Sequence, residues 1–157
     1  MATDHERTPK LLVFGQQDEH LNTCLEELTS DTDYATTFKA LKKAFRKQPP
    51  GVILFMIDSL QTAELCIEAF EYIRNGLREN DCIFIVAHPQ SYAPDALSWI
   101  ETYNIASFIV LIDERTLLNK SIIERSLKSW SHLAKVKAQY QAETDLCLLY
   151  TSDAADD

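Results

Sequence analysis

Four short apolar runs divide the chain, and none of them alternates apolar with polar side chains. They are Leu11–Phe14, 52–57, 82–87 and 107–112. Runs of this length without alternation are typical of strands buried on both faces of a sheet. The segments between them carry helical periodicity, and strand–helix alternation predicts a parallel sheet covered by helices. We therefore expect functional side chains just after the runs, at the carboxyl ends of the strands.

The periodicity and the helix-breaking residues set the expected elements. Asp18 is a suitable N-cap for the first helix, and Pro49-Pro50-Gly51 ends the second. The strands are expected over 10–14, 34–36, 52–57, 82–87 and 107–112, and the helices over 18–28, 37–47, 62–79 and 95–103.

The last helical segment is too long to serve only as a cover for the sheet. It starts near residue 114 or 115, and no stop signal precedes residue 143. Apolar residues recur in steps of three and four from Leu118 through Leu127 and Trp130 to Tyr140, as in a weak heptad seam. The part from Trp130 to Tyr140 extends about 15 Å at 1.5 Å per residue. We predict that it leaves the domain as a signalling or dimerising helix.

Composition excludes several classes of function. The 157 residues carry a net charge of −9, which disfavours nucleic-acid binding. A basic stretch over 39–47 is interpreted as a solvated helix face rather than a partner site. No apolar stretch reaches membrane-spanning length, and the polar start lacks the apolar core of a signal peptide. We expect a cytoplasmic protein that binds neither membrane nor nucleic acid.

The chemistry-bearing residue types give no motif for a metal or a cofactor. Cysteines at positions 24, 66, 82 and 147 lack metal-binding spacing, and we expect Cys66 and Cys82 to be buried. The three glycines form no phosphate-binding loop. We expect neither a metal site nor a cofactor, and His88 is interpreted as a loop histidine.

The end of the chain departs from the preceding pattern. Residues 146–157 resemble the translation of a sequencing adapter, and we interpret them as non-native or disordered. On this view the gene was cut and an output domain followed residue 145. The alternatives are a genuine acidic tail and a stand-alone adaptor that ends near residue 145.

Five strand–helix units within about 120 residues resemble the receiver domain of bacterial response regulators. The resemblance implies an α/β, flavodoxin-like, doubly wound five-stranded parallel sheet of order 2-1-3-4-5, here with an extended C-terminal helix. It predicts a receiver-like domain over 8–128, a helical linker over 129–145 and the tail over 146–157.

The receiver site is degenerate in this chain. Gly15 and Gln16 stand where the family has two acids that bind Mg²⁺, so Mg²⁺ binding is not expected. Ala87 replaces the Thr or Ser that senses the phosphoryl group. Leu111 or Ile112 replaces the lysine that pairs with the acceptor, and no lysine lies within seven residues of either.

Asp58 is the candidate phosphoacceptor. Counted from Pro50, it can occupy the acceptor position at the end of the third strand. A shorter register would put Met56 there and leave Asp58 in the loop. Because the metal ligands, the hydroxyl and the cation are missing, we expect self-phosphorylation to be very slow.

A loop motif narrows the resemblance. Residues 89–95 and 103–105 are similar to a receiver subgroup that precedes phosphohydrolase-type and cyclic-dinucleotide output domains. Residues 141–146 resemble the entry to diguanylate cyclase domains. The receiver-like part itself is not expected to be an enzyme.

The sequence thus predicts a phosphorylation-independent receiver-like signalling module that acts through dimerisation. The dimer is expected to form through the fourth helix, fifth strand and fifth helix, together with the C-terminal helix. Trp99, Tyr103, Trp130 and Tyr140 are the candidate interface residues, although each could equally pack in the core. A histidine kinase is a further candidate partner. The alternative function is a phosphorylatable receiver that uses Asp58.

Overall fold

Five parallel strands form a single sheet in the computed structural model, which describes residues 9–26, 28 and 31–155, with side chains as far as residue 146. The sheet order is β2-β1-β3-β4-β5, which confirms the predicted topology. The strands are β1 (Leu11–Phe14), β2 (Thr32–Ala35), β3 (Val52–Met56), β4 (Ile83–His88) and β5 (Ile105–Val110).

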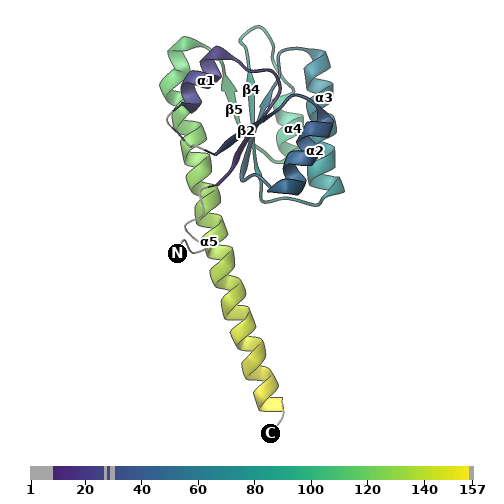
Figure 1. Cartoon of the computed structure of the whole chain (residues 1–157), viewed down its shortest axis with the longest axis vertical. Helices are drawn as coiled ribbons and strands as arrows, with labels where there is room; N and C mark the ends of the chain where they lie inside the picture. Colours follow the sequence, from purple (N-terminus) through teal and green to yellow (C-terminus); the bar gives the residue numbers. More distant parts are fainter. Residues whose placement is uncertain (1–8, 27, 29–30, 156–157) are drawn as a thin grey trace.

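Helices cover both faces of the sheet. They are α1 (Glu19–Leu25), α2 (Phe38–Lys47), α3 (Leu60–Glu71), the π-helical turn η2 (Tyr72–Gly76), α4 (Ala96–Tyr103), the 3₁₀ turn η3 (Asp113–Arg115) and α5 (Thr116–Ala155). α1 and α5 lie on one face, and α2, α3 and α4 lie on the other (Figure 1). No described helix combines the length and the apolar character needed to cross a membrane.

Each face of the sheet has its own apolar core. An aromatic cluster fills the α2–α3–α4 face, where the Phe70 ring contacts the rings of Phe55, Trp99 and Tyr103 at centroid distances of 4.6, 5.5 and 5.2 Å. Smaller aliphatic side chains fill the α1–α5 face, including the buried Leu21 and Ile123. The strand residues of β1 and the first four of β3 are buried, as their continuous apolar runs predict.

Local capping explains where the helices begin and end. Asp18 caps α1 as predicted, because its carboxylate accepts the Leu21 N–H at 3.1 Å. α3 begins at residue 60 rather than 62, because Ser59 and Thr62 form a reciprocal capping box. β5 begins at residue 105 rather than 107, because the left-handed Asn104 ends α4 and returns the chain directly to the sheet.

A buried arginine fixes that return. The Nε of Arg74 donates to the Tyr103 carbonyl at 2.9 Å, and its Nη1 donates to the Glu79 carbonyl at 3.0 Å. The guanidinium lies 3.7 Å from the centroid of the Phe84 ring. Burial lowers the pKa of Arg74 by penalising its charged form. The cation therefore joins η2 to the end of α4 in the core.

The long helix α5 packs on the sheet with its first part and then continues away from it (Figure 1). Ile123 and Leu127 are buried, whereas Leu133, Val136 and Tyr140 are exposed. The predicted extension past residue 127 is confirmed. The helix includes residues 146–155, and residues 156–157 lie outside the described part. The boundaries and native origin proposed for 129–145 and 146–157 stay predictions.

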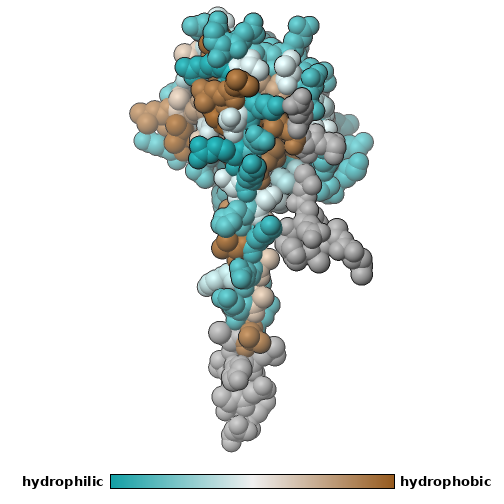
Figure 2. Space-filling model, turned by 90° about the vertical axis from the view of Figure 1, so that its left-hand side faces the viewer, coloured by the Kyte–Doolittle hydropathy of each residue, from teal (hydrophilic) through white to brown (hydrophobic). Residues whose placement is uncertain are grey.

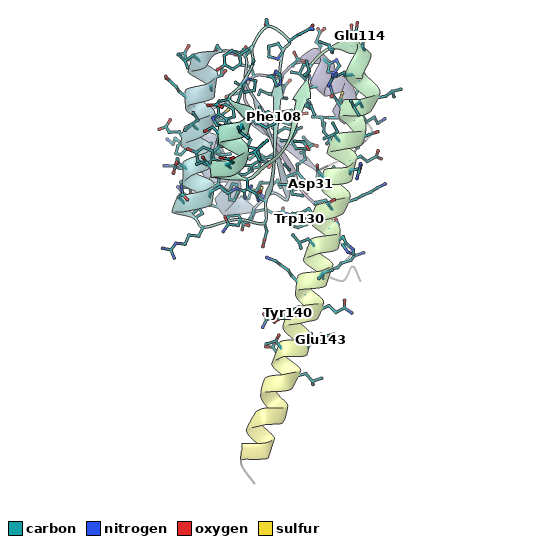
Figure 3. The ribbon with its side chains drawn as sticks, turned by 180° about the vertical axis from the view of Figure 1, so that it is seen from behind. Asp31, Phe108, Glu114, Trp130, Tyr140 and Glu143 are labelled. Carbon is teal, nitrogen blue, oxygen red and sulfur yellow. The ribbon has the colours of Figure 1, made fainter. Side chains whose placement is uncertain are left out.

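Trp130 holds α5 at the point where the helix leaves the sheet, as Figure 3 shows. A Cβ built on Gly51 would lie 2.6 Å from the Trp130 ring, so the ring rests directly on the glycine backbone. Two helical turns further along α5, the Lys137 ammonium pairs with the Asp81 carboxylate. The aromatic contact and the ion pair together set the exit direction of the helix.

Replacing Gly51 with Ala should displace the Trp130 ring and destabilise the protein by about 1–3 kcal/mol, because the added methyl group overpacks the contact. Urea denaturation would measure the free energy of unfolding of Gly51→Ala against the wild type, and of Gly51→Ala/Trp130→Ala against Trp130→Ala. The cost of the glycine change should shrink by at least about 0.5 kcal/mol once the ring is gone. Equal costs in both backgrounds would show that the contact does not constrain the helix.

Candidate functional site

A cleft of about 1060 Å³ opens at the carboxyl ends of β1 and β3, where a parallel sheet places its functional residues. The ends of both strands and the first two turns of α3 form most of it. Its lining residues are Gly15, Gln16, Gln17, Asp18, Thr36, Met56, Ile57, Asp58, Ser59, Gln61, Thr62, Glu64, Leu65, Glu68, Pro89 and Leu111.

At the end of β1, Gly15 lies against Met56. Gly15 has a φ of +128°, which side-chain-bearing residues rarely adopt, and its N–H donates to the Ala35 carbonyl at 2.9 Å. A Cβ built on Gly15 would lie 2.7 Å from the Met56 Cβ. An acid at position 15 is therefore incompatible with Met56 as it is packed. A side chain at position 15 would require Met56 to pack differently, so the glycine and the methionine depend on each other.

At the end of β3, the strand stops at Met56, so the structure has the shorter of the two registers considered for this strand. Met56 pairs with Ala87, and the buried Ile57 donates its N–H to the Ala87 carbonyl at 2.9 Å. Asp58 follows as an exposed residue whose Oδ1 accepts from the Thr62 hydroxyl at 3.1 Å. Whether Asp58 accepts a phosphoryl group stays a prediction.

Ala87 near the end of β4 and Leu111 directly after β5 carry apolar side chains. Ala87 is fully buried in the core between the sheet, α1 and α5. Leu111 is half-buried in the cleft wall, and its N–H donates to the His88 carbonyl at 2.9 Å. His88 is the last residue of β4 rather than a loop residue, because it still pairs with Val110 of β5. Its Nδ1 lies 2.9 Å from the Pro89 carbonyl.

The donor set of the cleft does not fit Mg²⁺. This ion prefers several oxygen ligands in octahedral geometry. The positions that face one another present a glycine and a thioether, and the Gln16 amide is exposed. Among the described residues, no three His, Cys, Asp or Glu side chains converge on a point that could hold a metal.

The four candidate interface residues have different environments. Trp99 and Tyr103 are buried in the aromatic core, and the Tyr103 hydroxyl donates to Glu71 at 2.7 Å. Burial and this hydrogen bond raise the pKa of Tyr103 to about 12. Trp130 is half-buried against Gly51, and Tyr140 is exposed. The interface role stays a prediction, and in this structure Tyr140 has the exposed surface for it.

Sequence reasoning missed the contribution of α3 to the cleft. Gln61, Glu64 and Glu68 line the cleft, but the sequence pattern of their helix predicts only which apolar residues form its buried stripe. Their spacing of three and four residues was the available signal, because it places them on one helix face.

The Gly15–Met56 contact predicts that Gly15→Ala is costly. The positive φ and the 2.7 Å approach together should lower the free energy of unfolding by more than about 1 kcal/mol. Gly76→Ala is the matched control, because its Cβ would meet no atom closer than 3.7 Å. Urea denaturation measures both variants. Equal stability of Gly15→Ala and the wild type would refute the proposed steric coupling.

No family model and no curated protein match this sequence. Several solved structures are similar to this chain in fold. NtrX from Brucella abortus superimposes with a TM-score of 0.62 at 15% identity, over 85% of this chain and 30% of that one. The N-terminal domain of a response regulator receiver protein from Methanoculleus marisnigri JR1 gives 0.53 at 18% identity, over 74% and 94%.

The response regulator LqsR from Legionella pneumophila gives a TM-score of 0.52 at 15% identity, over 86% of this chain and 49% of that one. This chain therefore spans about a third of NtrX and half of LqsR, but most of the Methanoculleus marisnigri receiver domain. Identities this low show the fold alone. That fold is the flavodoxin-like fold of response regulator receiver domains.

Proposed function

We propose that this chain is a receiver-like signalling module that works without phosphorylation, by self-association and through the direction of α5. The observation that carries the proposal is the packing of Gly15 against Met56 at the centre of the cleft. Apolar packing occupies the place where a phosphorylatable site would need charge. The module is regulatory rather than enzymatic, and we propose a cytoplasmic location for it.

The chemistry of phosphoryl transfer supports this proposal. Transfer to a carboxylate is catalysed by positioning and by neutralising the charge on the phosphoryl oxygens. Ala87 provides no hydroxyl, and Leu111 provides no cation. Gly15 and Gln16 provide no carboxylate for Mg²⁺. A phosphoryl group placed here would meet an apolar floor and acidic side chains.

A phosphorylatable receiver that uses Asp58 is the second candidate, and one observation favours it. Asp58 is exposed within the cleft lining, so a histidine kinase could reach its carboxylate. Against it, the Thr62 hydroxyl already bonds this carboxylate. The two candidates differ in whether a phosphoryl analogue changes the protein through Asp58.

Two apolar surfaces could support self-association. One comprises Leu97 and Ile100 of α4 with Leu117 and Leu118 of α5, all exposed. The other follows α5 beyond the sheet, where Leu133, Val136 and Tyr140 are exposed at steps of three and four. Figure 2 shows apolar side chains both on the globular part and at intervals along the helix. Steps of this kind suit a paired helical seam.

The helix would carry the state of the module to whatever follows it. α5 is 40 residues long, so it extends about 60 Å at 1.5 Å per residue. Two of the similar structures belong to chains much longer than the matching part. We propose that an output domain, such as a diguanylate cyclase or an HD-type phosphohydrolase, lies beyond α5. A rotation of paired helices would then reach it directly.

Self-association through the distal part of α5 should be lost in Val136→Glu, because two carboxylates would face each other across the seam. Sedimentation equilibrium of the full chain should give a dimer whose dissociation constant rises at least about tenfold in the variant, or about 1.4 kcal/mol. Mg²⁺ should not change the wild-type constant.

Ala138→Glu adds the same charge to the opposite side of α5 and should leave the dimer intact. A wild-type chain that stays monomeric at high concentration would contradict the proposal, as would equal effects of the two substitutions.

A further inference from the structure

The cleft at the carboxyl ends of the strands exposes an apolar floor to solvent. Met56, Leu65 and Leu111 are half-buried and Pro89 lies beside them, all within the lining of a cavity of about 1060 Å³. Ligand pockets are typically concave, largely apolar at the base and supplied with a few polar groups. The cavity is thus large enough for a small organic molecule with an apolar body.

The charge around this floor has one sign. Asp18, Asp58, Glu64 and Glu68 line the cleft, and no lysine, arginine or histidine is among its described lining residues. Asp18 lies at the start of α1, whereas Glu64 and Glu68 lie one turn apart on α3. Carboxylates in a cleft with low-dielectric walls attract cations and repel anions. The cleft therefore discriminates by charge before any specific contact is made.

The acids differ in their local bonds. Asp18 accepts the N–H of Leu21, and Asp58 accepts the hydroxyl of Thr62. Within the described part of the chain, the exposed carboxylates of Glu64 and Glu68 have neither an ion pair nor a hydrogen bond. These two carboxylates are thus available to a ligand.

The spread of the acids favours an organic cation over a metal ion. No three acidic, histidine or cysteine side chains of the described residues converge on one point. A metal ion gains most from convergent oxygen ligands. An organic cation needs no such convergence, because its ammonium group can pair with a single carboxylate while its apolar body packs on the floor.

We propose that this cleft binds a small organic cation, with an apolar body against Met56 and Leu111 and an ammonium group towards Glu64 and Glu68. The proposal concerns binding alone and is independent of the self-association proposed above. Its failure would leave the dimer unaffected, and loss of the dimer would leave the cleft unchanged.

Three probes of similar shape and different charge test the proposal on the full chain. 2-Phenylethylammonium, 2-phenylethanol and 3-phenylpropionate are titrated in turn while backbone amide shifts are followed by NMR. The ammonium should give saturable shifts at Gly15, Ile57 and Leu111 with a millimolar or lower dissociation constant. The alcohol should bind more weakly, and the carboxylate should give no saturable shift. Equal responses to all three probes, or none, would overturn the proposal.

Glu64→Gln/Glu68→Gln should raise the dissociation constant of 2-phenylethylammonium about fourfold or more, since each exposed carboxylate contributes roughly a factor of two to five to the affinity. Glu101→Gln/Glu124→Gln, at two exposed positions of α4 and α5 outside the cleft, is the control that removes the same two charges, and it should have no effect. An equal loss in the control would mean that net charge alone attracts the probe.

Leu111→Lys places an ammonium group in the cleft wall and should abolish binding of the cationic probe, whereas Leu111→Gln should retain it. If Leu111→Lys does not fold, Glu64→Lys makes the same reversal at an exposed position. Undiminished binding of the cationic probe by the lysine variant that folds would contradict the proposed site.

Discussion

The sheet buried on both faces is the constraint on which the other features depend. The strand residues of β1 and the first four of β3 have no solvent-exposed side, so they can carry no chemistry themselves. Polar function must therefore lie where the strands end. At that edge the chain has packed Gly15 against Met56 instead of facing two acids across a metal. This apolar contact lies in the cleft lining, together with the exposed Asp58.

The opposite edge of the sheet controls the long helix. Gly51 precedes β3 and lies under the Trp130 ring, while Asp81 precedes β4 and pairs with Lys137. One end of β3 thus belongs to the cleft and the other end borders the exit of α5. A displacement of β3 would therefore move both the cleft lining at Met56 and the contact of Gly51 with Trp130. β3 thus joins the cleft lining at Met56 to the Gly51–Trp130 contact that holds α5.

The sheet order and the alternation of elements could be predicted because each strand is a continuous apolar run and each helix has a clear stripe. The receiver resemblance then supplied the positions to inspect, and Gly15, Ala87 and Leu111 occupy the expected strand ends. Element ends were less accurate where side chains decide them, as at the Ser59–Thr62 capping box and at Asn104. The sequence pattern could not decide whether Trp99 and Tyr103 pack in the core or form an interface, because large aromatic side chains serve in both places.

Other features depend on three-dimensional contacts that no local pattern encodes. The register at Asp58 follows from strand pairing, and the Gly15–Met56 contact joins residues 41 positions apart in the sequence. The burial of Arg74 could not be predicted, because its partners are backbone carbonyls of other segments. Glu64 and Glu68 belong to the cleft only because α3 packs beside the ends of the strands, and this packing is a tertiary contact.

The central claim is that this receiver fold does not respond to phosphorylation. Its most direct test is NMR of the full chain with Mg²⁺ and beryllofluoride, which mimics an acyl phosphate where an acceptor carboxylate and a metal site coexist. The account predicts amide shifts no larger than those caused by Mg²⁺ and fluoride separately. Saturable shifts around Asp58, Ala87 and Leu111 that disappear in Asp58→Ala would contradict it and establish a phosphorylation switch.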